Sequence, residues 1–196
     1  MAAGETPLRR NRDFNLLWSG QVLSDLGTRV AEIAMPLLVL ALTGSPAKAG
    51  IAGFVETLPL LVLTLPAGAL VDRWDRKALM IVCDSVRCLA FTSLVVAVAR
   101  GEATFAQILV VGLVDGTGYV FVSLSERSAL KRVVAEGHLA GALARNQARE
   151  YSALLAGQPL GGVLFGLSRQ APFLFNAASY LVSVATLALV RTDLRG

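Results

Sequence analysis

Long apolar runs separated by short polar segments make up most of the chain. A hydrocarbon core of about 30 Å requires roughly 20 apolar residues in a helix, and the runs reach that length. They are continuous, whereas barrel strands alternate apolar and polar positions over about ten residues. The sequence therefore predicts an all-α membrane protein with six transmembrane helices, at residues 14–42, 47–71, 78–99, 104–125, 139–167 and 171–190.

Turn residues and composition support this interpretation. Thr43-Gly44-Ser45-Pro46 follows the first run, Arg100-Gly101-Glu102 the third, and Ser168-Arg169-Gln170-Ala171-Pro172 the fifth, which predicts tight hairpins. The chain is 55% hydrophobic and 16% charged, whereas a soluble domain is about 25% charged. The bilayer is therefore the expected surrounding of residues 13–192.

The basic residues predict the orientation. Of 18 Lys and Arg, four lie inside the predicted spans, and most of the others lie on one side of the membrane. That side holds eleven: Arg9, Arg10, Arg12, Arg73, Arg76, Lys77, Arg127, Lys131, Arg132, Arg191 and Arg195. The other side holds Lys48, Arg100 and Arg169. The positive-inside rule then predicts two cytoplasmic termini, with residues 1–12 as a tail and 193–196 as the start of a linker.

The net charge of +4 follows from this topology and requires no nucleic-acid partner. The first run is too long and too charged for a cleavable signal peptide, so it is expected to remain as a membrane anchor in the cell membrane.

A dense group of charges lies between the second and third runs, in the segment Gly68-Ala69-Leu70-Val71-Asp72-Arg73-Trp74-Asp75-Arg76-Lys77. This segment resembles the signature cytoplasmic loop of the major facilitator superfamily, with Gly68, Asp72, Arg73, Arg76 and Lys77 at the pattern positions. Asp75 replaces the usual second glycine. The same departure is found in the drug and siderophore exporter branch, which includes macrolide and enterobactin exporters.

The resemblance implies one half of a proton-coupled exporter, built as two inverted three-helix repeats. In that family the loop carboxylate, here Asp72, links helix ends and stabilises one state of an alternating-access cycle, partly through the other half of the protein. A complete member has twice as many spans. The implied partners are the lipid bilayer, a small-molecule substrate, protons, and a C-terminal half or a second copy. A weak internal repeat, 66–70 against 159–163, agrees with the construction.

The first span carries a polar stripe. Gln21, Ser24, Asp25, Thr28, Arg29 and Glu32 occupy an arc of roughly 140° on one helix face, and the resemblance places such a stripe on a central cavity. There Asp25 or Glu32 would exchange protons, together with Asp115 and Tyr119, which share a face of the fourth span. The alternative is that Asp25, Arg29 and Glu32 only neutralise one another.

Other charges within the spans favour structural roles. Asp84 and Arg87 have i,i+3 spacing and are expected to form an ion pair that braces the bundle. Glu56 is expected to make an interhelical hydrogen bond rather than bind a proton. Arg145, Arg149 and Glu150, near the start of the fifth run, are expected to join a charge network with the signature loop.

The fifth span contains Gly157-Gln158-Pro159-Leu160-Gly161-Gly162, which resembles an antiporter element of the superfamily with the proline displaced by one position. The glycines also permit close helix packing, and Pro159 permits a kink. In the sixth span, residues 173–180 resemble the Phe-rich, Asn-Ala-x-Ser-aromatic segment of the exporter branch.

A second hypothesis is a non-transporting membrane scaffold or assembly partner that retains the fold. An enzyme is disfavoured, because the sequence has no metal-ligand cluster, nucleophile constellation or phosphate-binding loop. No metal and no cofactor is expected.

Overall fold

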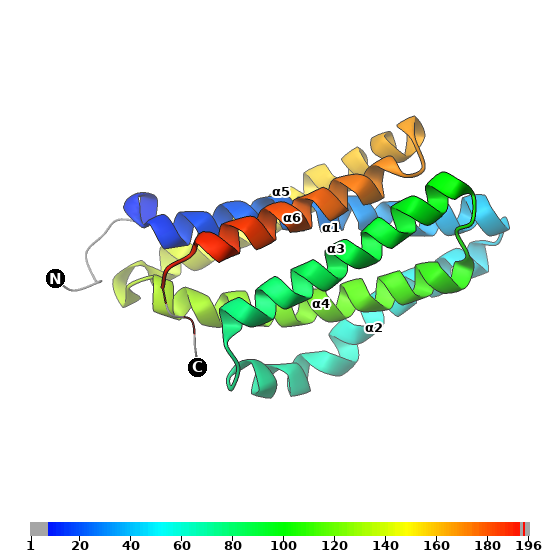
Figure 1. Cartoon of the computed structure of the whole chain (residues 1–196). Coiled ribbons are helices and arrows are strands. Elements are labelled where there is room, and N and C mark those ends of the chain that lie inside the picture. The colour runs from blue at the N-terminus through cyan, green and yellow to red at the C-terminus, as the bar shows by residue number, and fades with distance from the viewer. Residues whose placement is uncertain (1–7, 193, 195–196) are drawn as a thin grey trace.

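The computed structural model describes residues 8–192 and residue 194. A short 3-10 helix at Leu8–Arg10 precedes six long helices, which pack side by side (Figure 1). The helices are α1 (Arg12–Thr43), α2 (Pro46–Val71), α3 (Arg76–Arg100), α4 (Phe105–Val133), α5 (Glu136–Leu167) and α6 (Ala171–Leu189). The predicted all-α architecture is confirmed, and α1 begins at the same end of the bundle at which α6 ends (Figure 1).

Helix caps fix the turns where the sequence predicted them. Gly44 and Gly101 end α1 and α3 in the left-handed conformation, with φ of 64° and 72°, which glycine adopts without steric penalty. The side chains of Ser45, Asp75 and Thr104 accept backbone hydrogen bonds at the starts of α2, α3 and α4. These caps satisfy donors that each helix start leaves open.

The predicted boundary between the fourth and fifth spans was wrong. The fourth helix continues to Val133 and the fifth already begins at Glu136, because a helix can extend beyond the apolar core into the polar interface. Ala129, Leu130 and Val133 are buried there, in a cluster with Phe14 and Leu194. Asn11, the cap of α1, donates to the Val133 carbonyl at 2.7 Å.

The central helix of the bundle is α1, which packs chiefly against α5 and α6. On the other side of the bundle α4 packs against α2 and α3, and α3 also contacts α6. The apolar core includes Met35, Leu38, Phe91, Phe173 and Tyr180. Val30 of α1 is fully buried.

Five of the six helices are long and apolar enough to cross a membrane, and α5 is the exception. One of its charged residues, Arg149, is buried inside the bundle. The Arg149 guanidinium donates to both oxygens of Glu126 on α4 at 2.6 and 2.8 Å, and to Asp25 on α1 at 2.7 Å. Asn146 also donates to Glu126, at 3.0 Å. We call Asp25, Glu126 and Arg149 the α5 triad.

The triad corrects two predictions. Arg149 was expected to join the signature loop, but its ion-pair partners lie on α1 and α4. Asp25 was expected on the central cavity or, in the alternative, to be neutralised by Arg29 and Glu32 of its own helix, but it pairs with Arg149. The ion-pair partners of Arg149 and Asp25 lie on other helices, and the spacing of residues along one helix does not predict which helix packs against it.

Two glycines of the antiporter-like element allow α5 to approach α1 closely. A Cβ atom on Gly157 would lie 2.5 Å from the Arg29 Cβ, and one on Gly161 would lie 2.6 Å from the Val30 carbonyl oxygen. Neither position has room for a side chain. Gly162 differs, because no described residue lies within 4 Å of the position of its Cβ. A side chain at position 162 would therefore meet no neighbouring helix among the described residues.

We expect the Gly161→Leu variant to be destabilised by about 1–3 kcal/mol or more, because the side chain would be forced against α1 backbone. The measurement is thermal unfolding of the purified chain in detergent, with Gly162→Leu as the matched control at an open position. An equal effect of both substitutions would contradict the close packing of α5 on α1.

We expect the Arg149→Gln variant to lose about 3–5 kcal/mol of stability, because it leaves two carboxylates facing each other without a cation. Neutralising all three members together, as Asp25→Asn, Glu126→Gln and Arg149→Gln, should restore much of that loss. Unfolding midpoints of the single and triple variants provide the measurement. A triple variant no more stable than the single one would refute the charge argument.

Candidate functional site

A second group of buried charges surrounds Arg87, in the middle of the bundle. Its guanidinium donates from Nε to Asp115 Oδ1 at 2.9 Å, from Nη1 to Asp84 Oδ1 at 3.3 Å and from Nη2 to the Thr28 hydroxyl at 3.1 Å. The same group lies 4.2 Å from the centre of the Tyr180 ring. Arg87 is fully buried, so its partners replace the water it has lost.

Residues of α6 complete this group. The Tyr180 hydroxyl donates to Asp115 Oδ1 at 2.7 Å and the Ser183 hydroxyl to Asp84 Oδ2 at 2.6 Å. Gln21 donates to Ser183 at 3.1 Å. We call Asp84, Arg87 and Asp115 the central triad. The predicted ion pair of Asp84 with Arg87 is present, but Asp115 is the nearer carboxylate, so the pair is not self-contained.

A cavity of about 360 Å³ opens beside the central triad, between α1, α2 and α4. Asp115 and Tyr119 of α4 line it, together with Arg29 and Glu32 of α1 and Glu56 of α2. The remaining lining residues are Thr28, Gly53, Thr57, Leu60 and Gly116. Three carboxylates from three helices therefore meet at one cavity, with one arginine among the lining residues.

The cavity carboxylates differ in their partners. Glu32 pairs with Arg29 at 2.9 Å, and the Arg29 guanidinium lies 5.9 Å from the centre of the Tyr119 ring. Asp115 is held by Arg87 and Tyr180. Within the described part of the chain, Glu56 makes no hydrogen bond or ion pair, so the interhelical hydrogen bond expected from the sequence is not found.

A narrow polar crevice of about 10 Å³ lies between the two triads. Thr28, Arg87 and Tyr119 line it on the side of the central triad, and Asp25 and Arg149 line it on the side of the α5 triad. The predicted stripe on α1 is thus divided. Arg29 and Glu32 face the cavity, whereas Asp25 faces the crevice.

The signature loop contacts the end of α6. Lys77 Nζ donates to the carbonyls of Ala188 at 3.1 Å and Val190 at 2.7 Å, and Arg76 donates to the Leu194 carbonyl at 3.2 Å. Basic side chains at a helix C-terminus satisfy its open carbonyls. Asp75 caps α3.

The other loop residues point away from such contacts. The Asp72 side chain is 73% exposed and reaches Arg76 only at 3.8 Å. Arg73 is also exposed, and no atom of another described segment lies within 4 Å of a Cβ on Gly68. An exposed ion pair of this kind contributes little to stability.

Sequence reasoning assigned no role at the site to three residues that the triads depend on, Glu126, Tyr180 and Ser183. Asn176, Tyr180 and Ser183 follow one another at spacings of four and three on α6, and that polar stripe was a usable signal. Glu126 gave none, because it appeared to lie in a loop. The described residues contain no group of three or more His, Cys, Asp or Glu that could hold a metal ion.

Comparisons with known proteins agree on the family. A family model described as transmembrane secretion effector, of the major facilitator superfamily, matches residues 2–195. An uncharacterised MFS-type transporter of Bacillus subtilis, YfiS, is 27% identical over 96% of this chain and 45% of its own length. Macrolide efflux protein A of Streptococcus pyogenes is 22% identical over 91% of this chain and 44% of its own length.

A shorter match links the chain to the multidrug efflux pump Tap of Mycolicibacterium fortuitum, which is 33% identical over 48% of this chain and 23% of the pump. The chain thus spans about half the length or less of the curated relatives it matches. The fold is similar to that of a bacterial homologue of the iron transporter ferroportin in an outward-facing state, with a TM-score of 0.78 and 17% identity over 94% of this chain and 50% of that one. With the signature loop, the six helices and the family match in agreement, this chain belongs to the transmembrane secretion effector family of the major facilitator superfamily of membrane transporters.

Proposed function

We propose that this chain is the N-terminal half of a secondary exporter, which moves a drug-like small molecule outward by alternating access and couples that movement to protons. The observation that carries the proposal is the convergence of Glu32, Glu56 and Asp115 on one cavity. Carboxylates in a poorly hydrated cavity are the groups that bind protons or cations there. Family and fold are those of a transporter rather than an enzyme.

The helix neighbours support two inverted three-helix repeats. If α1 corresponds to α4, α2 to α5 and α3 to α6, then the packing of α1 against α5 and α6 corresponds to that of α4 against α2 and α3. The contact of α3 with α6 is unchanged by this correspondence, because the two helices exchange places. Inverted repeats of this kind place the substrate site near the bilayer midplane, where Asp115 lies in the middle of α4.

Exposed apolar side chains on α2 and α5 are compatible with a partner for this half. Leu65 on α2 is 89% exposed and Leu155 on α5 is 77% exposed. A C-terminal half, or a second copy, would cover these faces and close the other side of the cavity. Alternating access then consists of rocking one half against the other.

The signature loop is proposed to act on that partner. Asp72 contributes little within this half, since it is exposed and weakly paired, and its negative charge is available to the positive end of a partner helix. The loop, the start of α1 and the end of α6 are proposed to be cytoplasmic, as the positive-inside rule requires.

The names of the relatives support export of drug-like molecules. Macrolide efflux protein A and the multidrug efflux pump Tap are both similar to this chain. Asp25, Arg29, Glu32, Asp115 and Tyr119 are proposed as the residues that couple protons to substrate. The alternative is a membrane scaffold that keeps the fold without transport. Substitutions that neutralise Asp25, Glu32 or Asp115 would leave the activity of such a scaffold unchanged.

We expect Glu32→Gln and Asp115→Asn each to reduce pH-gradient-driven efflux of a monocationic dye by about tenfold or more, the size of a typical coupling between two binding sites. The measurement uses vesicles that contain the chain together with a candidate C-terminal half. Counterflow exchange without a pH gradient should persist, because it requires substrate movement but no net proton movement.

Glu136→Gln, at the exposed start of α5, is the matched control and should transport normally. Equal losses of driven efflux and counterflow would contradict proton coupling by these residues. Dye movement that is unaffected by either carboxylate variant would favour the scaffold alternative.

We expect Asp72→Asn to leave the stability of this half unchanged but to lower transport by the assembled protein. Arg76→Gln, in contrast, should lower the stability of the isolated half by about 1 kcal/mol, because it removes a buried hydrogen bond to the Leu194 carbonyl. Unfolding of the isolated half and efflux by the assembled one separate the two effects. A loss of stability in Asp72→Asn would oppose a role at the partner.

A further inference from the structure

Glu56 and Asp115 reach the cavity between α1, α2 and α4 from two helices at the same depth. Glu56 is ten residues after Pro46, where α2 begins, and Asp115 is ten residues after Phe105, where α4 begins. Both helices begin at the same end of the bundle (Figure 1). Ten residues of helix rise by about 15 Å, which is half of a hydrocarbon core of about 30 Å. Both carboxyl groups therefore lie near the middle of the membrane.

Glu56 is the carboxylate of the cavity that lacks a partner. Glu32 pairs with Arg29, and Asp115 accepts a hydrogen bond from Arg87. No hydrogen bond or ion pair reaches the Glu56 carboxyl group from any residue that the structure describes. A charge without a partner in a poorly hydrated site is costly. A ligand with one positive charge would remove that cost.

Helix packing, and no polar contact, fixes the position of Glu56. A Cβ on Gly116 of α4 would clash with the Glu56 carbonyl oxygen, and one on Gly112 would lie 3.6 Å from the Glu56 Cβ. The two glycines are one helical turn apart and share a face of α4, so α2 crosses α4 closely at this point. The backbone of Glu56 is thus held in place before a ligand binds, which lowers the cost of binding.

The same face of α2 leaves room for the apolar part of a ligand. Gly53, Thr57 and Leu60 line the cavity with Glu56, and their spacing of three or four residues puts them on one face. No atom of another described segment lies within 4 Å of a Cβ on Gly53, and Leu60 is 45% exposed. The cavity volume of about 360 Å³ lies at the lower end of the range of about 300–1,000 Å³ for ligand pockets.

An organic cation fits this cavity better than a metal ion does. A hard divalent cation takes about six oxygen ligands. The described residues contain no group of three or more His, Cys, Asp or Glu that could hold a metal ion. The single unpaired carboxylate of Glu56 instead balances one positive charge.

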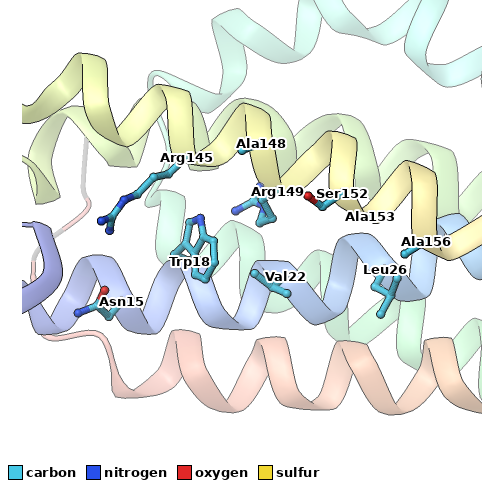
Figure 2. A pocket seen from close by; sticks show the side chains of 10 residues that line it. All are labelled: Asn15, Trp18, Val22, Leu26, Arg145, Ala148, Arg149, Ser152, Ala153 and Ala156. Carbon is cyan, nitrogen blue, oxygen red and sulfur yellow. The ribbon is translucent and has the colours of Figure 1, made fainter.

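A second groove, of about 450 Å³, lies between α1 and α5 and is unsuited to a cation (Figure 2). Arg145 and Arg149 are among its ten lining residues, and none of the ten is a carboxylate. Figure 2 shows both arginines on the α5 wall. Like charges repel, so the charge distribution of the bundle directs a cation to Glu56.

We propose that Glu56 binds the positive charge of an organic monocation and thereby selects cationic over neutral substrates. The apolar body of the substrate lies along Leu60 and the Tyr119 ring. Proton coupling then falls to Glu32 and Asp115, so that different carboxylates bind the substrate charge and the proton. This inference rests on the proposed function, because it names the substrate class of the same cavity.

Binding of a matched pair of ligands tests the inference. Methyltriphenylphosphonium is a cation, and triphenylphosphine oxide carries the same three phenyl groups without net charge. Equilibrium dialysis measures the Kd of each for the chain assembled with a candidate C-terminal half, without a pH gradient. We expect Glu56→Gln to raise the Kd of the phosphonium by about tenfold or more, which corresponds to about 1.4 kcal/mol. The Kd of the phosphine oxide should stay the same.

Two control variants separate the charge of Glu56 from its packing. Glu56→Asp keeps the charge and should retain most of the preference for the cation. Glu136→Gln removes a carboxylate from the exposed start of α5 and should leave both Kd values unchanged. Thermal unfolding checks every variant, and Glu56→Gln should not be destabilised, because it removes an unpaired charge. Equal weakening of both ligands by Glu56→Gln, or equal effects of Glu56→Gln and Glu136→Gln, would overturn the proposal.

The binding measurement also distinguishes this inference from the proposed function. Selective loss of phosphonium binding in Glu56→Gln, in a protein without proton-driven efflux, would keep the cation site and contradict the exporter. Proton-driven efflux by a protein whose phosphonium Kd is the same with and without Glu56→Gln would keep the exporter and overturn the cation site. Failure of the unsubstituted protein to bind the phosphonium, or displacement of the phosphonium by millimolar Mn²⁺, would overturn it as well.

Discussion

The desolvation of Arg87 is the constraint on which the rest of this bundle depends. A guanidinium within a lipid-embedded bundle must find its partners inside the protein. Arg87 finds Asp84 on its own helix, Asp115 on α4, Thr28 on α1 and the Tyr180 ring on α6. Four of the six helices are therefore fixed in register by one side chain. Gly118 makes this possible, since a Cβ there would lie 2.5 Å from the Arg87 Cδ.

The position of the cavity follows from the same residue. Arg87 and Tyr180 both donate to Oδ1 of Asp115, and this fixes the carboxyl group at the wall between α1, α2 and α4. Asp115 Oδ2 receives no hydrogen bond from the described residues. Asp115 thus accepts hydrogen bonds from the interior of the bundle through Oδ1, while Oδ2 is left without such a donor at the cavity wall. A structural role for Asp115 in the bundle does not exclude a role at the cavity, because the hydrogen bond from Arg87 is what orients its carboxyl group.

Hydropathy and turn residues were sufficient to predict the architecture. The apolar runs predicted six helices at the right places, although α5 is not apolar enough to cross a membrane by composition. Gly44 and Gly101 marked two hairpins, since these signals are local. The end of α4 was missed, because Glu126 and its neighbours leave the apolar core while the helix continues. The partners of Asp25 and Arg149 were missed for a different reason. They are separated by 124 positions in the sequence, and helix periodicity predicts which face a residue occupies but not which helix lies opposite.

The two triads share an imbalance that bears on mechanism. Each contains two carboxylates and one arginine: Asp84 and Asp115 with Arg87, and Asp25 and Glu126 with Arg149. Selection for stability alone favours neutral groups, because a surplus charge out of water is costly. A proton or a bound cation relieves the surplus. The polar crevice joins the two triads through Thr28 and Tyr119, so neutralising one triad changes the electrostatic potential at the other. A charge that enters one triad therefore changes the energy of the other, although each triad joins a different set of helices.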